Sequence, residues 1–288
     1  MNEQVYRDLD KTHVFSTMLK TLYSQSAKHL DIRKDSSSFN FGRLSHMNVL
    51  EPERFEEETI EQPVFAPLSK EMKLKYAVTM VNGIVSEVHT DYGRTKECRE
   101  QKELFEKESD GLLVVSKSDA ERLKEMKAVL ISENEPFYKS YIVDGESEAT
   151  IVRNNFQCGD MSAPAKARLD KLIIDDTFKL ITILDYKTTQ NASPHAFKYE
   201  VKKYGYEIQA AFYIDIVMDN PFYKDHKIDF IWLAQESLPP YNFGYYRCSE
   251  DTYLDGKHKY QSVFKTAVDI LNGAKKEGYK ASKEIVSI

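Results

Sequence analysis

The sequence predicts an α/β (α+β) protein in which helices flank a mixed central sheet and a helical elaboration precedes it. Strand-like runs rich in β-branched residues lie at 149–157, 166–175 and 180–187, and stretches with helical periodicity lie on both sides of them. The chain has 288 residues, of which 41 % are hydrophobic, so it can bury a substantial core. An order of helices, strands, helices, strands and a final helix is typical of a sheet covered by helices.

The N-terminal part is predicted to be helical. Apolar side chains recur at helical spacing within the first 30 residues, at Val14, Met18, Leu19 and Leu22. A polar joint follows at 31–38. The stretch FNFGRLSHMNVLEPERF then predicts a short helix that begins after Gly42 and ends before Pro52.

The next part of the chain is strongly charged. Residues 51–62 hold six Glu and one Arg, which we interpret as a solvated helix start or loop. Residues 70–140 predict mostly helices, although Val78–Val88 fits either a helix or a strand. We therefore expect a helical N-terminal elaboration at 1–140 and a core at 141–288, packed together as one compact unit.

The elements of the predicted core follow from pattern and punctuation. The runs 166–175 and 180–187 are joined by the short polar link DTFK, which predicts a hairpin. The remaining predicted elements are helices at 194–203 and 206–218 and strands at 227–235 and 241–249. The final 35 residues predict a long amphipathic helix whose apolar face holds Tyr260, Phe264, Val268 and Leu271.

Bulk properties exclude several classes of protein. No stretch reaches the roughly 20 apolar residues that span a bilayer, and the first residues lack the basic flank and apolar core of a secretory signal. The three cysteines are dispersed and no CxxC occurs, which argues against a disulfide framework and a cysteine-built metal site. Neither GxxxxGK[ST] nor GxGxxG occurs. We expect a cytoplasmic protein with no membrane contact.

The formal net charge of −6 argues against a protein that simply coats nucleic acid, because such a surface is basic. This average covers unlike parts. Residues 51–62 sum to −5, whereas residues 163–205 sum to +3 and residues 257–284 to +4. The balance is compatible with an enzyme that meets DNA through one locally basic cleft.

The most informative stretch is ARLDKLIIDDTFKLITILDYKTTQ. If its two strands are antiparallel neighbours, Asp170 on the first and Asp185 near the end of the second converge on one point. Side chains alternate along a strand, so Asp185 and Lys187 share a face while Tyr186 points away. Two carboxylates and an ammonium on one surface suit hydrolysis of a phosphodiester.

The carboxylates, with a main-chain carbonyl such as that of Tyr186, would supply the hard oxygen ligands that Mg²⁺ prefers. Lys187 would orient or deprotonate the attacking water, or neutralise the transition state. The alternative is ordinary solvated turn chemistry, because the bare spacing of two Asp and one Lys is common. The buried run LITIL leading directly into DYK favours the functional interpretation.

Four parts of the chain resemble the PD-(D/E)xK nuclease superfamily, and within it the RecE-type (exonuclease VIII-like) and phage recombination exonucleases. FGRLSHMNVLEPERF is similar to the family's Gly-x-x-x-His helix followed by Glu-Pro, and ESEATIV to its Glu before a strand. KARLDKLI and ITILDYKTT match the nuclease core, and YEIQAAFYIDI resembles the motif on the following helix. The positions so matched are His46, Glu148 (with Glu146 as the alternative), Asp170, Asp185, Lys187, Gln209 and Tyr213. Leu169 stands where the name-giving proline is expected.

The resemblance implies a restriction-endonuclease-like core and roles for these residues. Metal would be held by Asp170, Asp185, Glu148, the Tyr186 carbonyl and His46. Lys187 would act on the attacking water, and Gln209 and Tyr213 would position the lysine or the scissile phosphate. On a helix Gln209 and Tyr213 lie four residues apart on one face. Judged without the resemblance, Gln209 would be a surface residue and His46 a partly buried structural histidine.

The implied function is that of a double-strand DNA exonuclease dependent on Mg²⁺, with Mn²⁺ as a second candidate. It would degrade one strand 5′ to 3′ and leave 3′ single-stranded tails for homologous recombination. Implied partners are double-stranded DNA ends, a single-strand annealing protein and further copies of the chain in a ring. The setting would be a bacterial or phage-infected cytosol. Basic residues predicted to contact DNA are Lys166, Arg168, Lys198, Lys202 and Lys203.

Two alternatives remain from the sequence. The first is an endonuclease or a RecB-like repair nuclease on the same core, although the missing cysteine cluster counts against the iron–sulfur branch. The second is a non-catalytic module that binds DNA or protein. The intact set of Asp170, Asp185 and Lys187 argues against this second alternative, since closely placed carboxylates without a metal are electrostatically costly.

Overall fold

The computed structural model describes residues 3–32, 37–67, 73, 78–81, 84–88, 90–133 and 135–279. The chain forms two compact units. The core unit consists of Met1–His46 and Ala128–Ile288, and the inserted unit is Met47–Lys127. The sequence predicts a division at residue 140, between a helical elaboration and the nuclease core, and this stays a prediction. The two compact units have other bounds, because residues 1–46 group with the part of the chain that forms the sheet.

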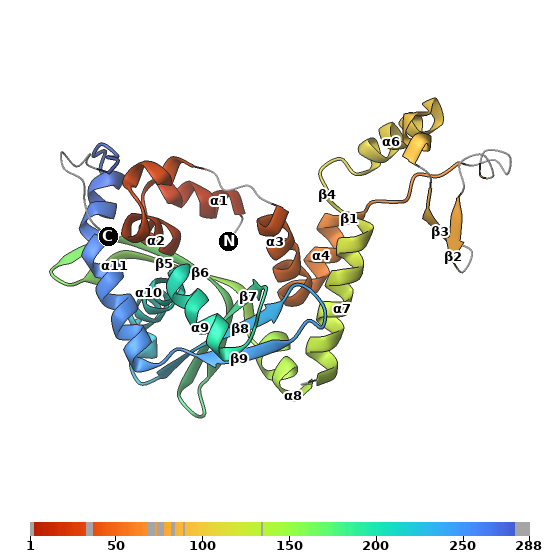
Figure 1. Ribbon diagram of the computed structural model, residues 1–288. Coiled ribbons are helices and arrows are strands. Elements are labelled where there is room, and N and C mark those ends of the chain that lie inside the picture. Colours follow the sequence, from red (N-terminus) through yellow and green to blue (C-terminus); the bar gives the residue numbers. More distant parts are fainter. Residues whose placement is uncertain are drawn as a thin grey trace, which may run out of the picture. The chain divides into compact units, whose positions relative to one another are not determined.

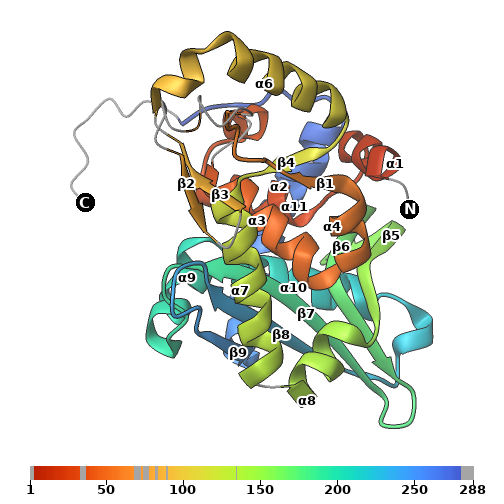
Figure 2. The same ribbon diagram turned by 90° about the vertical axis from the view of Figure 1, so that its right-hand side faces the viewer.

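A five-stranded mixed sheet forms the centre of the core unit, in the order β5-β6-β7-β8-β9 (Figures 1 and 2). Neighbouring strands are antiparallel except for β7 and β8, which are parallel. A parallel pair needs a long crossover, and two helices supply it here. The predicted α/β class with a mixed sheet is confirmed. The strands are β5 (Glu146–Cys158), β6 (Met161–Asp175), β7 (Leu180–Thr189), β8 (Lys227–Glu236) and β9 (Phe243–Arg247).

Local sequence accounts for the hairpins of this sheet. Gly159 lies in the tight β5–β6 turn with φ 59°, a conformation that glycine adopts without steric cost. The β6–β7 hairpin uses the predicted link DTFK, and Asp175, the last residue of β6, accepts backbone hydrogen bonds from Thr177 and Phe178. Residues 181–186 of β7 are all buried, as expected for a strand with neighbours on both sides.

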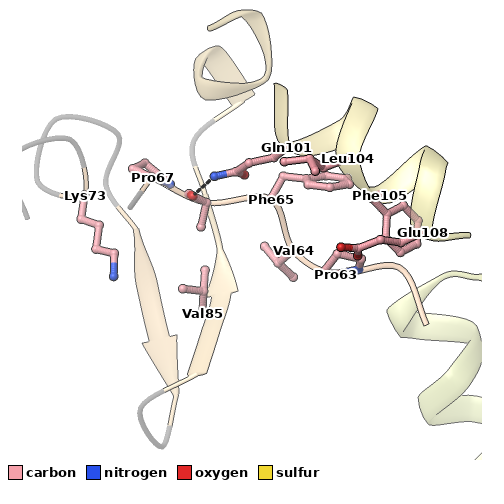
Figure 3. Close-up of a pocket in the computed structure, with 11 residues that line it drawn as sticks. Pro63, Val64, Phe65, Pro67, Lys73, Val85, Gln101, Leu104, Phe105 and Glu108 are labelled. Carbon is pink, nitrogen blue, oxygen red and sulfur yellow. Dashed lines mark hydrogen bonds between the residues drawn. The ribbon is translucent and has the colours of Figure 1, made fainter. Parts of the chain in front are cut away.

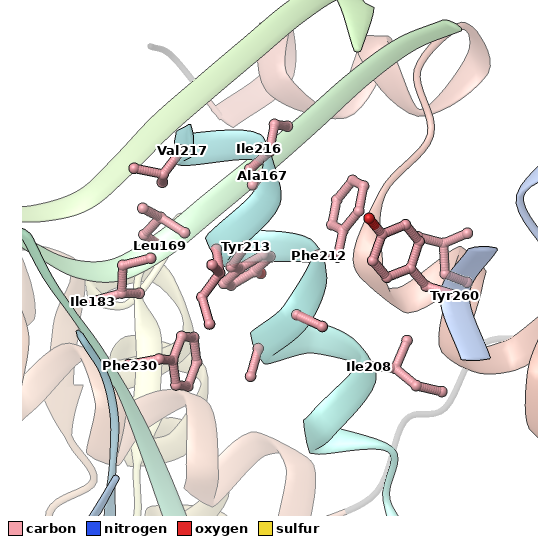
Figure 4. Close-up of a cluster of buried hydrophobic side chains, with 14 of the residues drawn as sticks. Ala167, Leu169, Ile183, Ile208, Phe212, Tyr213, Ile216, Val217, Phe230 and Tyr260 are labelled. Carbon is pink, nitrogen blue, oxygen red and sulfur yellow. The ribbon is translucent and has the colours of Figure 1, made fainter. Parts of the chain in front are cut away.

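Helices α2, α10 and α11 pack on one another and on one face of the sheet. Helix α10 is buried over most of its length, and Ile208, Phe212 and Ile216 lie in the core with Leu169 of β6 and Tyr260 of α11 (Figure 4). A Cβ at Gly256 would lie 2.0 Å from the Glu207 carbonyl oxygen, so glycine permits the close approach of α11 to α10. The helices of this part are α2 (Ser16–Ser24), α9 (Pro194–Lys203), α10 (Tyr206–Met218) and α11 (Glu250–Leu271).

The prediction that the helix carrying His46 begins after Gly42 is wrong. Helix α3 (Ser37–Leu50) begins before Gly42 and contains it. A Cβ at Gly42 would lie 3.2 Å from Thr188 Oγ1 on β7, so this glycine serves close packing of helix against strand and does not mark a helix start. The other short elements of the core unit are α1 (Glu3–Asp8), η1 (Leu9–Lys11), η2 (Ala27–Asp31), α8 (Glu135–Tyr138), η4 (Lys139–Val143) and η5 (Pro221–Tyr223).

Where the structure describes it, the inserted unit is mostly helical, as predicted, and it adds two pairs of short strands. Strands β1 and β4 form a parallel pair, and β2 and β3 an antiparallel one within the ambiguous stretch Val78–Val88. Runs of only three or four residues carry too little periodicity to be recognised. The unit is acidic, with 13 Lys and Arg against 18 Asp and Glu. Its elements are α4 (Pro52–Glu58), β1 (Thr59–Glu61), β2 (Thr79–Val81), β3 (Ile84–Glu87), η3 (Thr90–Arg94), α6 (Lys96–Glu108), β4 (Leu113–Val115) and most of α7 (Lys117–Glu133).

Among the residues that the structure describes, no helix is both long and apolar enough to cross a bilayer.

Candidate active site

Three acidic side chains fall in one row across β5, β6 and β7. The β6–β7 ladder ends at the pair Lys171–Leu184, and the next positions in register are Asp170 and Asp185. On β5 the residues flanking Glu148 pair with those flanking Asp170, so these two acids lie opposite each other. The structure therefore brings together the three acids that the sequence singled out.

The Asp170 side chain enters the gap where β6 and β7 part. The backbone N–H of Tyr186 donates to Asp170 Oδ2 over 2.8 Å, so a side chain accepts the bond that a strand carbonyl would otherwise take. This bond fixes the carboxylate beside the backbone of the DYK segment.

Without a bound cation, the row of three carboxylates destabilises the folded protein. Like charges at opposite strand positions destabilise a sheet. Glu148 also has φ 51°, a left-handed conformation that side chains other than glycine rarely adopt. Such strain is concentrated at functional sites. A cation between the carboxylates would offset their repulsion, which makes the row a candidate metal centre on electrostatic grounds.

One end of the row, here called the histidine pole, consists of His46, Glu148 and Asp170. His46 Nε2 lies 2.9 Å from Asp170 Oδ2, and His46 Nδ1 lies 3.5 Å from Glu148 Oε1. One ligand atom from each of the three residues lies within 4.8 Å of the others. Two hard carboxylate oxygens and an imidazole nitrogen at this spacing fit a divalent cation, with carboxylates suited to Mg²⁺ and Mn²⁺.

Helix α3 is held against β7 so that His46 reaches this position. Gly42 lies one turn before His46 on the same helix face, and its missing side chain allows the close approach described above. Ser45 Oγ lies 2.8 Å from Tyr186 Oη, and the Tyr186 hydroxyl donates to Gln235 Oε1 on β8 over 2.7 Å. These three side chains are buried, so the chain of bonds ties helix and sheet together beside the row.

The pKa values of His46 and Asp170 at the histidine pole are strongly shifted. Burial disfavours the charged imidazole, but the carboxylates of Asp170 and Glu148 outweigh it and raise the pKa of His46 to about 9. Burial likewise disfavours ionised Asp170, yet His46, Lys187 and the Tyr186 N–H lower the pKa of Asp170 to about 2. Without metal, a protonated His46 therefore provides the positive charge between the two carboxylates.

The other end of the row, here called the lysine pole, consists of Asp185, Lys187, Gln209 and Lys20. Lys187 Nζ lies 2.5 Å from Asp185 Oδ2, and Gln209 Nε2 donates to Asp185 Oδ1 over 2.9 Å. Lys20 Nζ donates to Gln209 Oε1 over 3.1 Å. Asp185 is fully buried, with Oδ1 in the hydrogen bond from Gln209 and Oδ2 in the ion pair with Lys187.

Within this pole, Lys187 is charged. Burial lowers the pKa of Lys187, but Asp185 and Asp170 together hold it above its ordinary value. An ammonium in this state donates hydrogen bonds and neutralises negative charge, but it cannot accept a proton. Of the roles predicted for Lys187, orientation of water and charge neutralisation fit this charged state, and its role in catalysis stays a prediction.

Lys20 was missed from the sequence. It lies on α2, far along the chain from the nuclease motifs, and the helical pattern there indicates only an amphipathic helix. Burial, together with the nearby Lys187, lowers the pKa of Lys20 to about 8, although Asp185 and Asp170 oppose this shift. Only the fold brings α2 beside α10, so no sequence signal could have identified the contact.

Two further predicted positions, Tyr186 and Tyr213, are both buried. The ring of Tyr186 points to α3, away from Asp185 and Lys187, as strand alternation predicts. The role of its carbonyl as a metal ligand stays a prediction. Tyr213 is buried in the core (Figure 4), where Ser16 Oγ donates to its hydroxyl over 3.4 Å. It supports α2 and α10 near the lysine pole from within the core.

The predicted DNA-binding cations separate into two groups. Lys166 is fully buried, with its ammonium 2.5 Å from Asp10 Oδ1 and 3.7 Å from the centre of the Tyr6 ring, so a DNA phosphate cannot reach it. That expectation is corrected, because α1 and η1 cover this side of β6. Arg168 stacks on the same ring, pairs with Glu3 and lies 3.8 Å from Glu148 Oε2. The exposed cations are those of α9: Lys198, Lys202 and Lys203.

Two cavities lie away from the row. A cavity of about 400 Å³ in the inserted unit is lined mainly by apolar side chains, among them Val64, Phe65, Leu104 and Phe105 (Figure 3). None of its lining residues belongs to the motifs of the sequence. A second cavity, of about 260 Å³, lies between α9, β8, β9 and the start of α11, and Lys198 and Lys202 line it.

Comparisons with known proteins agree with this geometry. The family described as a PDDEXK-like domain of unknown function (DUF3799) matches residues 13–285. The crystal structure described as "Putative exonuclease" from Eubacterium rectale is similar over 100 % of this chain and 96 % of that chain, with 14 % identity and a TM-score of 0.51. The crystal structure of SSO0001 covers 89 % of this chain and 86 % of that chain at 14 % identity, but its TM-score of 0.29 supports no fold assignment. The search of curated proteins gives no match.

Proposed function

The chain belongs to the PDDEXK-like family described as DUF3799, within the PD-(D/E)xK nuclease superfamily, and we propose that it is a divalent-metal-dependent DNA exonuclease. The observation that carries the proposal is the row of acids at the parting of β6 and β7, flanked by His46 at one end and Lys187 at the other.

The histidine pole is the part of the row that would hold the metal. Glu148, Asp170 and His46 offer ligand atoms close enough for one cation. Asp185 and the Tyr186 carbonyl lie on the neighbouring strand β7, where Asp185 is opposite Asp170 in register. A divalent cation would stabilise charge on the phosphodiester and supply an activated water. We propose Mg²⁺ as the physiological ion, with Mn²⁺ as the alternative.

The lysine pole would act directly on the substrate. The Lys187 ammonium, held charged by Asp185, would orient the attacking water and neutralise negative charge that develops on the phosphate. Gln209 would hold Asp185, and with it the ammonium, in place.

We further propose that the substrate is the end of a DNA duplex. Support comes from the resemblance to phage recombination exonucleases and from the name of the Eubacterium rectale structure. Degradation of one strand from 5′ to 3′, a role in recombination, a ring of several copies and an annealing protein as partner belong to the same proposal. The exposed lysines of α9 would contact the DNA backbone.

Digestion of linear, end-blocked and closed circular duplex DNA tests the proposal. We expect nucleotide release from linear DNA with Mg²⁺ or Mn²⁺, with none in EDTA. Circular DNA should remain intact. Cutting of closed circles would reassign the protein as an endonuclease, and inactivity with every divalent metal would favour a binding module.

Asymmetric end labels test the polarity separately. Early loss of the 5′ label on each strand is expected, and earlier loss of the 3′ label would contradict that part of the proposal. Sedimentation of the full chain with and without DNA would test the ring.

A further inference from the structure

We propose that Lys20 is a positioning residue of the active site, which fixes the Gln209 side-chain amide in the orientation that donates to Asp185. This inference rests on the proposed nuclease function and adds to it a residue outside the nuclease motifs. It is carried by the bridge from Lys20 Nζ through Gln209 to Asp185, with distances of 3.1 Å and 2.9 Å.

The chemistry of the bridge allows only one orientation of the amide. An ammonium has only donors, an ionised carboxylate has only acceptors, and a glutamine amide has one end of each kind. With Oε1 toward Lys20 and Nε2 toward Asp185, both ends are satisfied. Rotation of the amide by 180° would set donor against donor and acceptor against acceptor, so the cation on one side selects the hydrogen bond on the other.

Burial makes this selection effective. Gln209 is only 8 % exposed and Asp185 is fully buried, so water has little access to a misplaced amide group. A buried polar group without its partner is costly, which raises the penalty for the rotated state. Helix α2 contributes Lys20 by packing directly on α10, which carries Gln209.

The consequence reaches Lys187 through Asp185. Gln209 engages Asp185 Oδ1, which leaves Oδ2 directed at Lys187 Nζ at 2.5 Å. A freely rotating Gln209 would release Oδ1 and allow the carboxylate to turn, and the ammonium of Lys187 would lose its fixed position. Lys20 thus acts on the reaction through two side chains and is not itself required to touch the DNA.

Steady-state kinetics of four forms of the full chain test this inference: wild type, Lys20→Met, Gln209→Met and the double variant. We expect Lys20→Met to lower kcat about tenfold with little change in KM, as for the loss of one charge-assisted hydrogen bond. In the Gln209→Met background the same substitution should have almost no further effect, because the two residues act as one unit. Lys20→Arg should restore most of the activity.

The control is Lys265→Met, which removes an exposed lysine on α11 that is paired only with Asp269 in its own helix. This control should leave kcat and KM unchanged, and thermal unfolding of all variants shows whether each is folded.

An effect of Lys20→Met that appears mainly in KM and persists undiminished in the Gln209→Met background would overturn the inference, because it would mean direct contact with the substrate. Full activity of Lys20→Met would overturn it as well. Inactivity of the wild type with every metal contradicts the proposed function instead, so the two failures are distinguishable.

Discussion

The two poles of the active site solve the same electrostatic problem in different ways. Both hold a carboxylate of the acidic row beside a cation. At the lysine pole, Asp185 is fully buried and its two oxygens are engaged by Lys187 and Gln209. At the histidine pole, Glu148 and Asp170 are partly exposed, and the cation between them is a histidine that loses its charge as the pH rises through about 9.

From this difference we propose different tasks for the two poles. A permanent ammonium cannot be exchanged for a metal, so the lysine pole is a fixed electrostatic device that needs no preparation before the reaction. A titratable imidazole can give up its proton and become a ligand, so the histidine pole is the exchangeable part. The sequence predicts metal ligation by Asp170 and Asp185 alike, and this stays a prediction; in the metal-free structure Lys187 and Gln209 engage Asp185, whereas His46 lies beside Asp170.

The strongest way to break the histidine pole is Asp170→Asn. The carboxylate is the member of the row that touches both His46 and the DYK backbone, so we expect nuclease activity to fall about 1,000-fold or more. Metal affinity, measured by calorimetry, should fall with it. Asp160→Asn in the exposed β5–β6 turn is the matched control and should behave as wild type. Retention of activity in Asp170→Asn would remove this residue from the metal centre.

Lys187→Met should break only the lysine pole. We expect kcat to fall about 100-fold, since one group that stabilises the transition state is lost. Metal affinity should change little, because the histidine pole keeps its three ligands. If calorimetry showed that metal binding is lost together with activity, the separation into two poles would be wrong.

The pH dependence of stability sharpens the comparison without any substrate. In metal-free protein the pKa of His46 is about 9, above the ordinary value of 6.5, so its contribution to stability is complete below pH 6.5 and is lost as the pH rises to 9. We expect this loss to be on the order of 3 kcal/mol. Thermal unfolding of wild type and His46→Asn across pH 6 to 9 should show converging midpoints. A constant difference between the two proteins would contradict the prediction.

The smallest effect is expected from Tyr186→Phe, which removes the hydroxyl between Ser45 and Gln235. We expect a loss of about 1–2 kcal/mol in the free energy of unfolding, since buried hydrogen-bonding groups are left unpaired. Denaturant unfolding measures it. Because this chain of bonds supports His46 and not Lys187, metal affinity should weaken more than the lysine pole's contribution to kcat. An equal loss at both poles would contradict this.

The parts of the fold that the sequence predicts well are those with long, uninterrupted patterns. Helices α9 and α10 begin and end at the predicted residues, and the β6–β7 hairpin follows its turn signal. The convergence of Asp170 and Asp185 could be predicted because a hairpin fixes which strand positions lie side by side.

What the sequence could not supply is packing between distant segments. The burial of Lys166 depends on α1 and η1, and the role of Lys20 depends on α2 lying beside α10. Local propensity predicted that Gly42 marks the start of a helix. In the structure a glycine is needed there because α3 packs closely on β7, about 150 residues away in the sequence. In the inserted unit, β1 and β4 pair across a long interval of sequence, and β2 and β3 are a hairpin of very short strands, so neither pair leaves a periodic signal.

The position of the inserted unit has a consequence for how the chain folds. The core unit is assembled from residues 1–46 and 128–288, so His46 can meet Asp170 only after the whole of residues 47–127 has been bridged as a loop. Each doubling of a flexible loop costs only about 0.6 kcal/mol, so the insertion burdens stability little. Contacts of long sequence separation slow folding far more. The sheet, with its β5–β6 and β6–β7 hairpins, is therefore expected to form early. Packing of α3, which carries His46, against the sheet is expected to be a late step in refolding.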